Sequence, residues 1–344
     1  MASDYRFSFG PWNISTGEDP FGPAVRPAME LAAKIPLFRK LGFDEMQFHD
    51  DDVVPDADAP WATVQTQARE MKKVLDGEGL VAEFVAPRLW FHPKTVDGGY
   101  TANDAGDRKY AIDRSKRAID IANLVGTSNL VLWLAREGTY CREAKDPIQA
   151  TGRLVEAIDA MLAHDPKVRI LIEAKPNEPT DMAYLPTTGH ALGLAYRTSD
   201  PARVGTLIES AHSILAGLDP SDDMGYALWH GKLWGVHLND QNGLKYDQDK
   251  SFGAADLRRA FNQVWVLERG GYGKRGGVVG LDVKAMRTTR PEKQTAHLAN
   301  SKEFFLMLVE CCRSLDAGRI ESLRAERDYE ELERYILKHL MGKG

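Results

Sequence analysis

The sequence predicts an α/β protein, a (β/α)8 TIM barrel with a C-terminal helical extension. Short runs of apolar, β-branched or aromatic residues recur along the chain, and amphipathic segments of helical period separate several of them. There are eight such runs, which is the number of strands that the barrel needs. With 344 residues, the chain is long enough for a barrel of about 250 residues and further helices.

The predicted strands are residues 6–9, 45–48, 81–85, 129–133, 169–172, 204–208, 233–238 and 277–281. The clearest helical segments between them are residues 64–75, 110–124 and 148–162. A short apolar run also fits a buried helix, so this alternative stays open for single runs. The pattern of the whole set favours the barrel.

The C-terminal part of the chain has a different pattern. The glycine-rich residues 270–277 are predicted to form a loop before the last strand. After about Lys302 the pattern is helical, and residues 315–344 are predicted to form one or two charged amphipathic helices. We therefore predict a barrel over residues 1–300 and a helical tail over residues 301–344. The tail is either a solvated cap or an arm that packs on another subunit.

The composition is that of a soluble globular enzyme, with 43% hydrophobic residues, 27% charged residues and a formal net charge of −6. The mild acidic excess without basic clusters argues against nucleic acid and anionic membranes as partners. The chain has neither an apolar signal core near its start nor an apolar run of the roughly 18 residues that span a bilayer. The three cysteines have no zinc-site spacing, so a reduced cytoplasm is the expected location.

Polar side chains stand at the carboxyl ends of most predicted strands. They are His49 and Asp52, Glu173, Glu209 and His212, His237, and Asp282. The carboxyl ends of the strands in a parallel barrel converge on one face, where active sites are built. So many acidic groups at one mouth repel one another unless a cation lies among them.

Each of these residues has a simpler explanation when it is taken alone. His237 fits a hydrogen-bonded core histidine, Glu209 fits a helix cap, and Asp247 and Asp249 fit turn residues. The joint pattern favours metal, and carboxylates with two imidazoles and no thiolate suit Mg2+, Mn2+ or Co2+. The pair of Glu209 and His212, together with the two aspartates, predicts a second ion that shares a carboxylate with the first.

At this point the sequence resembles the xylose isomerase family, from Phe7 to about Asp282. The segments that carry the resemblance are residues 48–55 (FHDDDVVP), 130–138 (LVLWLAREG), 172–179 (IEAKPNEP), 185–190 (LPTTGH) and 245–249 (KYDQD). The resemblance implies an aldose–ketose isomerase that binds two divalent metal ions and moves a hydride between C2 and C1 of a small sugar. It also implies a homodimer or homotetramer.

The resemblance assigns roles to single residues. Glu173, Glu209 and Asp282 match ligands of the first ion, and Glu209, His212, Asp247 and Asp249 match ligands of the second. Lys175 matches the lysine that hydrogen-bonds the carbonyl oxygen at C1, although a buried ion pair with Glu173 is an alternative. His49, oriented by Asp52, matches the residue that assists ring opening, and near neutral pH it can take and return the anomeric proton.

The substrate wall is assigned in the same way. Trp12, Trp90 and Trp133 match the apolar wall that keeps water from the hydride transfer, with Trp90 where the family has phenylalanine. Lys284, which the family shares, is expected to bind substrate. Phe21 resembles the aromatic residue that a neighbouring subunit contributes.

The first metal site departs from the family. His237 stands where xylose isomerases have an aspartate, so imidazole replaces a carboxylate, as in rhamnose isomerases and one-metal ketose 3-epimerases. The loss of a negative charge makes the ion a stronger Lewis acid and favours Mn2+ or Co2+ over Mg2+. Asn239 and Asp240 are expected partners of the ring nitrogen. After the third strand, Arg88 stands near the expected sugar, where the family has small polar residues.

Two other functions stay open. One is a one-metal ketose 3-epimerase that works by proton transfer, which His237 favours but which has no use for Lys175 or for Asp247 and Asp249. The other is a non-catalytic sugar-binding barrel.

Overall fold

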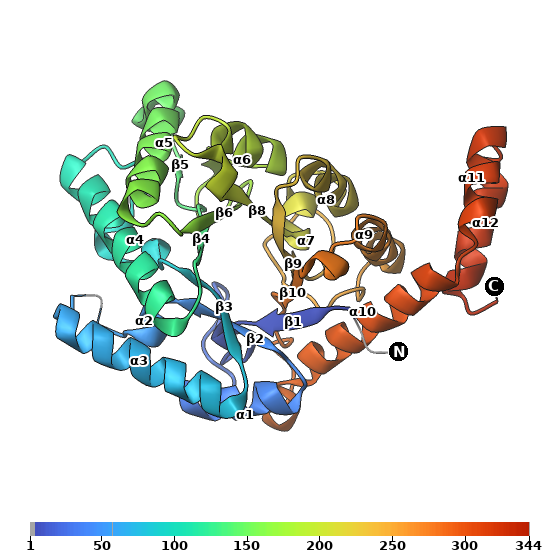
Figure 1. Cartoon of the computed structure of the whole chain (residues 1–344), viewed down its shortest axis with the longest axis horizontal. Helices are drawn as coiled ribbons and strands as arrows, with labels where there is room; N and C mark the ends of the chain where they lie inside the picture. The colour runs from blue at the N-terminus through green and yellow to red at the C-terminus, as the bar shows by residue number, and fades with distance from the viewer. Residues whose placement is uncertain (1–3, 57, 344) are drawn as a thin grey trace.

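The computed structural model, which describes residues 4–56 and 58–343, is built around a closed barrel of parallel strands (Figure 1). The strands follow the order β1-β10-β9-β8-β6-β4-β3-β2 around the barrel. Their bounds are β1 (Arg6–Phe9), β2 (Glu45–His49), β3 (Val81–Ala86), β4 (Asn129–Trp133), β6 (Arg169–Glu173), β8 (Val204–Glu209), β9 (Leu233–Leu238) and β10 (Val278–Leu281). The predicted barrel and its eight strands are confirmed, each end within one residue.

The predicted strands and the observed ones differ mainly at their carboxyl ends, where the polar residue continues the strand. Glu173 is still paired with Trp133 and Leu207, and Glu209 is paired with His237. The barrel ladder therefore holds the backbone of these polar residues, and their positions do not depend on mobile loops.

Helices follow the strands, and most of them cover the outside of the barrel (Figure 1). They are α1 (Leu31–Lys40), α2 (Asp50–Val53), α3 (Trp61–Glu78), α4 (Ala105–Val125), α5 (Pro147–His164), α6 (Thr188–Ala195), α7 (Ser210–Leu215), α8 (Pro220–Trp229), α9 (Leu257–Arg269), α10 (Ala296–Ser314), α11 (Ala317–Glu326) and α12 (Tyr329–Leu340). Aspartate side chains cap several of them, such as Asp104 before α4 and Asp146 before α5. An additional two-stranded sheet, β5 (Gly138–Thr139) with β7 (Met182–Ala183), lies outside the barrel and was not predicted.

The inside of the barrel is filled by side chains from alternate strand positions. Leu171 and Leu207 belong to a buried apolar cluster, and each lies two residues before a glutamate of the mouth. Because side chains on a strand alternate between two faces, Glu173 and Glu209 also point into the barrel axis, above that apolar layer. The bottom of the barrel is thus packed, and the polar groups are collected at its mouth.

Helix α10 packs against the outside of the barrel and spans the boundary predicted at residue 300. Phe305 is fully buried, and its ring lies 4.9 Å from Tyr5 and 5.6 Å from Phe7 between centroids. Beyond it, α11 and α12 extend away from the barrel as the predicted charged helices (Figure 1). No helix in the described part of the chain is long and apolar enough to cross a membrane.

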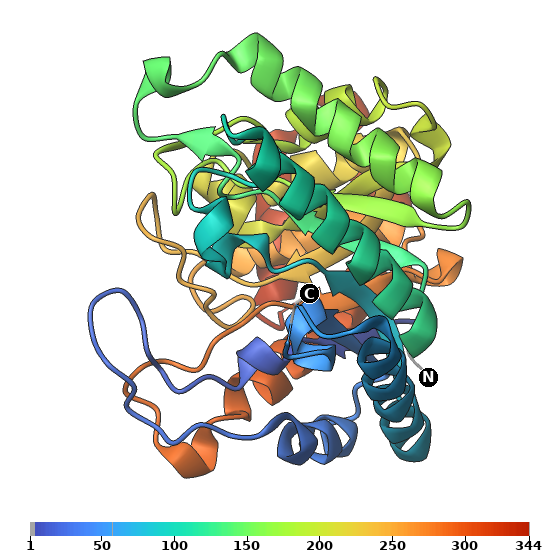
Figure 2. The ribbon, with the colours of Figure 1, turned by 90° about the vertical axis from the view of Figure 1, so that its left-hand side faces the viewer.

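A long loop after β1 stands beside the segment after β10 (Figure 2). Arg26 donates hydrogen bonds to the carbonyl oxygens of Met286 and Thr289, at 3.0 and 3.1 Å. Arg287 donates to the carbonyl oxygen of Gly22 at 3.1 Å. These contacts hold the start and the end of the barrel together at its mouth.

We predict that Phe305→Ala destabilises the whole barrel by about 3–5 kcal/mol, because the substitution leaves a cavity between α10 and β1. Met307 lies on the same helix, and its side chain is 55% exposed. As the matched control, Met307→Ala should change the free energy of unfolding by no more than about 0.5 kcal/mol. Urea unfolding followed by circular dichroism measures both variants, and equal effects would show that α10 is only an appendage.

Candidate metal centre

Four side chains from four neighbouring strands meet at the mouth of the barrel. Glu173 ends β6, Glu209 ends β8, His237 lies on β9 and Asp282 follows β10. Each of them offers a ligand atom, and these atoms lie within 4.8 Å of one another. The sequence-predicted first metal group is therefore brought together in space, and its members are buried except for the partly exposed Asp282.

Several polar atoms of this group are buried without a hydrogen-bond partner in the described residues. Both ring nitrogens of His237 are of this kind, and Nδ1 lies 3.5 Å from Oε1 of Glu173 and 3.7 Å from Oδ2 of Asp282. Buried polar atoms are rarely left without partners, and those of metal sites are satisfied by the ion. The residues thus fit a divalent cation.

The protonation of the group also indicates a missing positive charge. Burial lowers the pKa of His237, but the neighbouring carboxylates of Glu173 and, to a lesser extent, Asp282 and Glu83 together raise that pKa to about 9. Burial, together with the charges of Asp247 and Asp282, raises the pKa of Glu209 well above its usual value. Without an ion, the group must therefore take up protons, because its carboxylates outnumber the cations near them.

A second group shares Glu209 with the first. His212 on α7 and Asp247 in the loop after β9 offer ligand atoms that lie with that of Glu209 within 4.8 Å of one another. Nε2 of His212 is 3.3 Å from Glu209 and 3.2 Å from Oδ2 of Asp247. Nδ1 of His212 and Oδ1 of Asp247 are buried without a hydrogen-bond partner in the described chain. These three residues also fit a cation.

Two lysines neutralise the aspartates of the loop after β9. Nζ of Lys175 donates to Oδ2 of Asp247 at 2.8 Å, and Lys284 pairs with Oδ2 of Asp249. The partner of Lys175 is thus Asp247, whereas Glu173 was the alternative considered from the sequence. Although burial lowers it, the charge of Asp247 raises the pKa of Lys175 above its usual value, so this lysine is charged at neutral pH.

Asp249 lies beside the second group and is not one of its converging members. Its Oδ1 accepts a hydrogen bond from Asn239 at 3.2 Å, and its backbone is held at φ 46°. A left-handed aspartate in an active-site loop stores strain that the surrounding contacts must maintain. Burial and the charge of Asp247 raise the pKa of Asp249 to about 7.

Asn239 forms hydrogen bonds with Glu209 and Asp249, a role that the sequence did not reveal. Its Nδ2 donates to Oε1 of Glu209 at 2.7 Å as well as to Asp249, and its Oδ1 accepts the N–H of Ala211. The expectation that Asn239 and Asp240 contact the ring of His237 is wrong. Asp240 instead accepts backbone N–H groups of the loop after β9, at Ala255 and Asp256.

The predicted aromatic wall lines one side of the mouth. Between ring centroids, Trp12 lies 4.5 Å from His49, His49 lies 5.2 Å from Trp90, and Trp90 lies 4.6 Å from Trp133. Nζ of Lys175 is 5.1 Å from the centroid of the Trp133 ring. The predicted wall residues, the histidine and the lysine therefore form one continuous surface.

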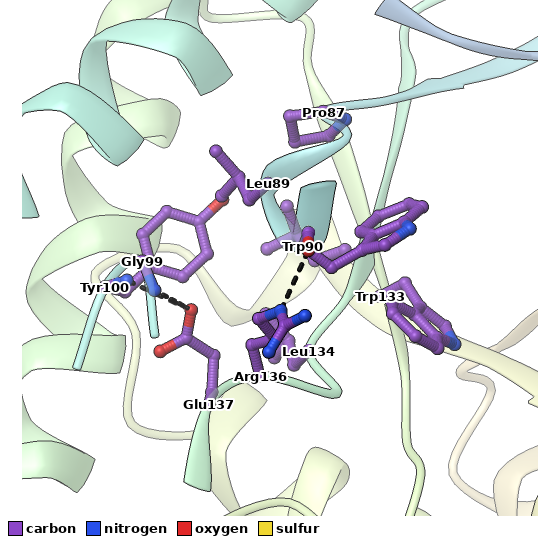
Figure 3. A pocket seen from close by; sticks show the side chains of 10 residues that line it. Pro87, Leu89, Trp90, Gly99, Tyr100, Trp133, Leu134, Arg136 and Glu137 are labelled. Carbon is purple, nitrogen blue, oxygen red and sulfur yellow. Dashed lines mark hydrogen bonds between the residues drawn. The ribbon is translucent and has the colours of Figure 1, made fainter. Parts of the chain in front are cut away.

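Contacts behind the wall hold it in place (Figure 3). Nε of Arg136 donates to the carbonyl oxygen of Trp90 at 2.8 Å. The buried carboxylate of Glu137 accepts the N–H groups of Gly99 and Tyr100, at 2.8 and 3.0 Å. The loops after β3 and β4 are thus tied together, a role that the sequence did not indicate for Arg136 and Glu137.

His49 lies at the edge of the site and has two charged neighbours. Its Nδ1 is 3.1 Å from Oδ2 of Asp52, as predicted, and Nη2 of Arg88 also contacts the same nitrogen. Although burial raises it, the contacts with His49 and the charge of Arg88 bring the pKa of Asp52 below its usual value. Asp50, the neighbour of His49 in sequence, is held by Arg114 at 2.7 Å.

A cleft of about 650 Å³ opens beside the second group. Phe21, Tyr246, Asp247 and Lys284 line it. Phe21 is 73% exposed and contacts the ring of Tyr246 of its own chain at 5.3 Å between centroids.

Comparison with known proteins agrees with this fold. A model of the xylose isomerase-like TIM barrel family matches residues 35–323, which is most of the chain.

Solved structures show the same barrel. A xylose isomerase domain protein from Alicyclobacillus acidocaldarius subsp. acidocaldarius is similar with a TM-score of 0.65 and 15% sequence identity, over 90% of this chain and 100% of that one. A D-tagatose 3-epimerase-like protein is similar with a TM-score of 0.64 and 14% identity, over 89% and 98%. The 3-keto-D-glucoside 4-epimerase from E. coli has a TM-score of 0.61 and 13% identity, over 89% and 99%. At these identities the similarity establishes a shared fold.

We predict that the metal-free protein releases protons when it binds a divalent ion at pH 7. The pKa of His237 is about 9, so its ring is protonated at pH 7, whereas a ligating ring is neutral. The release from His237 should therefore disappear as the pH rises through about 9. Calorimetric titration in buffers of different ionisation enthalpy measures the number of protons released per ion bound. His237→Asn should release about one proton fewer, and the remote control His230→Asn should not; binding without release would contradict the assignment.

Proposed function

The chain belongs to the xylose isomerase-like TIM barrel family, and we propose that it is a divalent-metal-dependent aldose–ketose isomerase. Its substrate would be a monosaccharide, either a pentose or hexose like xylose and glucose or a related sugar such as rhamnose. The reaction would be a 1,2-hydride shift, in which hydride passes from C2 to C1 while a proton passes from the C2 oxygen to the C1 oxygen.

One observation carries this proposal: the two groups of ligand atoms share Glu209 and lie beside a charged lysine. Glu173, Glu209, His237 and Asp282 would hold one ion, and Glu209, His212 and Asp247 would hold the other. Shared carboxylates are the usual means of holding two ions close together. Asp249, assigned to the second ion on the family resemblance, would have to leave Lys284 to join it.

The divalent ions, Mg2+, Mn2+ or Co2+, would supply Lewis-acid stabilisation of the charge that develops on the sugar oxygens. Lys175 would donate a hydrogen bond to the C1 oxygen as it becomes negative. Its pairing with Asp247 at 2.8 Å supports this role, because that carboxylate keeps the ammonium group charged and directed into the site. Lys284, at the cleft, would contact the substrate from the other side.

The wall of tryptophans would exclude water from the reacting carbons. Trp12 also donates a hydrogen bond from Nε1 to Oδ1 of Asp282 at 2.8 Å, so the wall and a proposed metal ligand support each other. Exclusion of water favours hydride transfer over proton exchange with solvent. His49, which lies between Trp12 and Trp90, would assist the opening of the sugar ring.

We further propose that the protein works as a homodimer or homotetramer, with Phe21 reaching the site of a neighbouring subunit. Phe21 is 73% exposed on the loop after β1, although it is a large apolar residue. Aromatic residues are enriched at protein–protein interfaces, which supports this proposal.

A ketose 3-epimerase is the second candidate, and His237 favours it. Four ligands, Glu173, Glu209, His237 and Asp282, would suffice for one ion, and carboxylates among them would transfer the proton. Among the similar structures is one described as D-psicose 3-epimerase with D-tagatose, from Clostridium cellulolyticum H10. This reaction leaves His212, Asp247 and Lys175 without a role, which is why we prefer the isomerase.

Deuterium labels at C2 of an aldose and at C3 of a ketose distinguish the two reactions. The Mn2+-loaded protein, tested against pentoses, hexoses and deoxyhexoses, should convert an aldose labelled at C2 into a ketose that retains the label at C1, and it should leave the label of a C3-labelled ketose in place. Mass spectrometry of the sugar and of the water measures the deuterium in each. Loss of the C3 label to water would identify the 3-epimerase, loss of the C2 label to water would contradict the hydride shift, and undiminished turnover after chelation with EDTA would contradict both candidates.

A second prediction concerns the second ion. Asp247→Asn should reduce the bound metal from two ions per chain to one and lower turnover by at least about 100-fold, because a charged ligand is lost beside Lys175. Elemental analysis after gel filtration measures the metal, and circular dichroism checks the fold. The matched control is Asp113→Asn, an exposed aspartate on α4, which should keep both ions. Two ions in the Asp247 variant would contradict the assignment.

A further inference from the structure

We propose that Arg88 is a positioning residue that fixes the proton of His49 on Nε2. This inference deepens the proposed function, on which the catalytic use of His49 rests. Arg88 follows β3 at the mouth of the barrel. Its backbone is held there by a hydrogen bond that its N–H donates to Oδ1 of Asp50 at 2.9 Å. Its side chain is 26% exposed.

The guanidinium group of Arg88 contacts the side chains of His49, Asp51 and Asp52. Nη2 contacts Nδ1 of His49 and lies 3.2 Å from Oδ1 of Asp52, while Nε lies 3.2 Å from Oδ1 of Asp51. His49, Asp51 and Asp52 also form a third group that by type could hold a metal ion. Because an arginine already provides the positive charge at all three, we assign this group to Arg88.

The chemistry of the three partners decides where the proton of the ring lies. Arginine has only donors and stays charged at all accessible pH values, so the nitrogen that it contacts must accept. Nδ1 of His49 therefore carries a lone pair, and the proton of the neutral ring is on Nε2. A proton on Nδ1 would point at an N–H of Arg88.

Asp52 does not need the ring as a donor. Its Oδ2, which lies 3.1 Å from Nδ1, accepts the backbone N–H of His49 at 2.8 Å, and its Oδ1 accepts from Arg88. Both oxygens are thus satisfied while Nδ1 stays unprotonated. Asp52 would orient the ring through Arg88 and the backbone.

The other nitrogen of His49 is free to meet the substrate. Nε2 makes no hydrogen bond with residues 4–56 and 58–343, and it is not among the buried unpartnered atoms. The ring lies between Trp12 and Trp90, so Nε2 is available to a substrate that would bind along the wall. His49 would then present a fixed N–H donor to a sugar oxygen during ring opening, and the acid–base exchange expected from the sequence is replaced by hydrogen-bond donation.

Charged groups face His49 from several elements. On α2 it faces Asp51 and Asp52, on the β3 side it faces Arg88, and on α1 Lys34 lies in the field of Asp52. While Arg88 is in contact, a proton on Nδ1 is disfavoured because two donors would face each other. Without Arg88, Nδ1 can carry the proton and donate it in a hydrogen bond to Asp52.

Nitrogen NMR of the histidine rings tests the assignment. The Mg2+-loaded protein is labelled with 15N-histidine, and the His49 signals, among those of the nine histidines, are those lost in His49→Gln. The wild type should show protonated Nε2 and unprotonated Nδ1 at about pH 7. Arg88→Met should move the proton to Nδ1 at the same pH. Asp52→Asn is the matched control and should keep the wild-type pattern.

The outcomes separate Arg88 from Asp52 and from the reaction itself. A proton on Nδ1 in the wild type would overturn the proposal. So would a shift of the proton in Asp52→Asn when Arg88→Met keeps the wild-type pattern. The wild-type spectrum decides even if a variant does not fold. The spectra need no turnover. If Nε2 is protonated but the protein has no isomerase activity, the lack of activity contradicts the proposed function. The role of Arg88 in placing the proton is then still supported.

Discussion

The structure depends on an excess of negative charge that the fold concentrates at one end of the barrel. Glu173, Glu209, Asp247 and Asp282 converge there with Asp249 beside them, and most of the five are buried. Isolated buried carboxylates are too unfavourable to persist, so each must have a cation, a proton or a hydrogen-bond donor. Lys175 and Lys284 satisfy part of the requirement, and the unpartnered nitrogens of His212 and His237 mark the place where positive charge is still missing.

The scaffold makes this arrangement possible because it holds the ligands on rigid elements. The backbones of Glu173 and Glu209 remain in the parallel ladder, and Asn239 joins Glu209 to Asp249. Trp12 donates to Asp282. A site that is prepared in this way loses little entropy when it takes up an ion or a sugar, which is the usual reason for placing catalytic groups at strand ends.

Two different electrostatic solutions lie within one mouth. Around Glu209, the carboxylates outnumber the nearby cations, so the group suits a metal. Around His49, Arg88 and Arg114 are paired with Asp50, Asp51 and Asp52, so the acidic run after β2 is neutralised by protein groups. Buried and half-buried carboxylates therefore occur in two settings at this mouth. Where arginines lie beside them they form ion pairs, and where arginines are absent they suit a metal ion.

The sequence by itself determined the barrel, because strand period, strand number and the polar residue at each strand end are local patterns that the fold preserves. It also indicated that Glu173, Glu209, His237 and Asp282 meet at the mouth, since parallel strands bring their carboxyl ends to one face. Only the tertiary structure decided the partners: Lys175 with Asp247, Asn239 with Glu209, and Arg88 with His49. These contacts join loops that are far apart in the chain, and their geometry depends on side-chain packing, which no spacing of residues encodes.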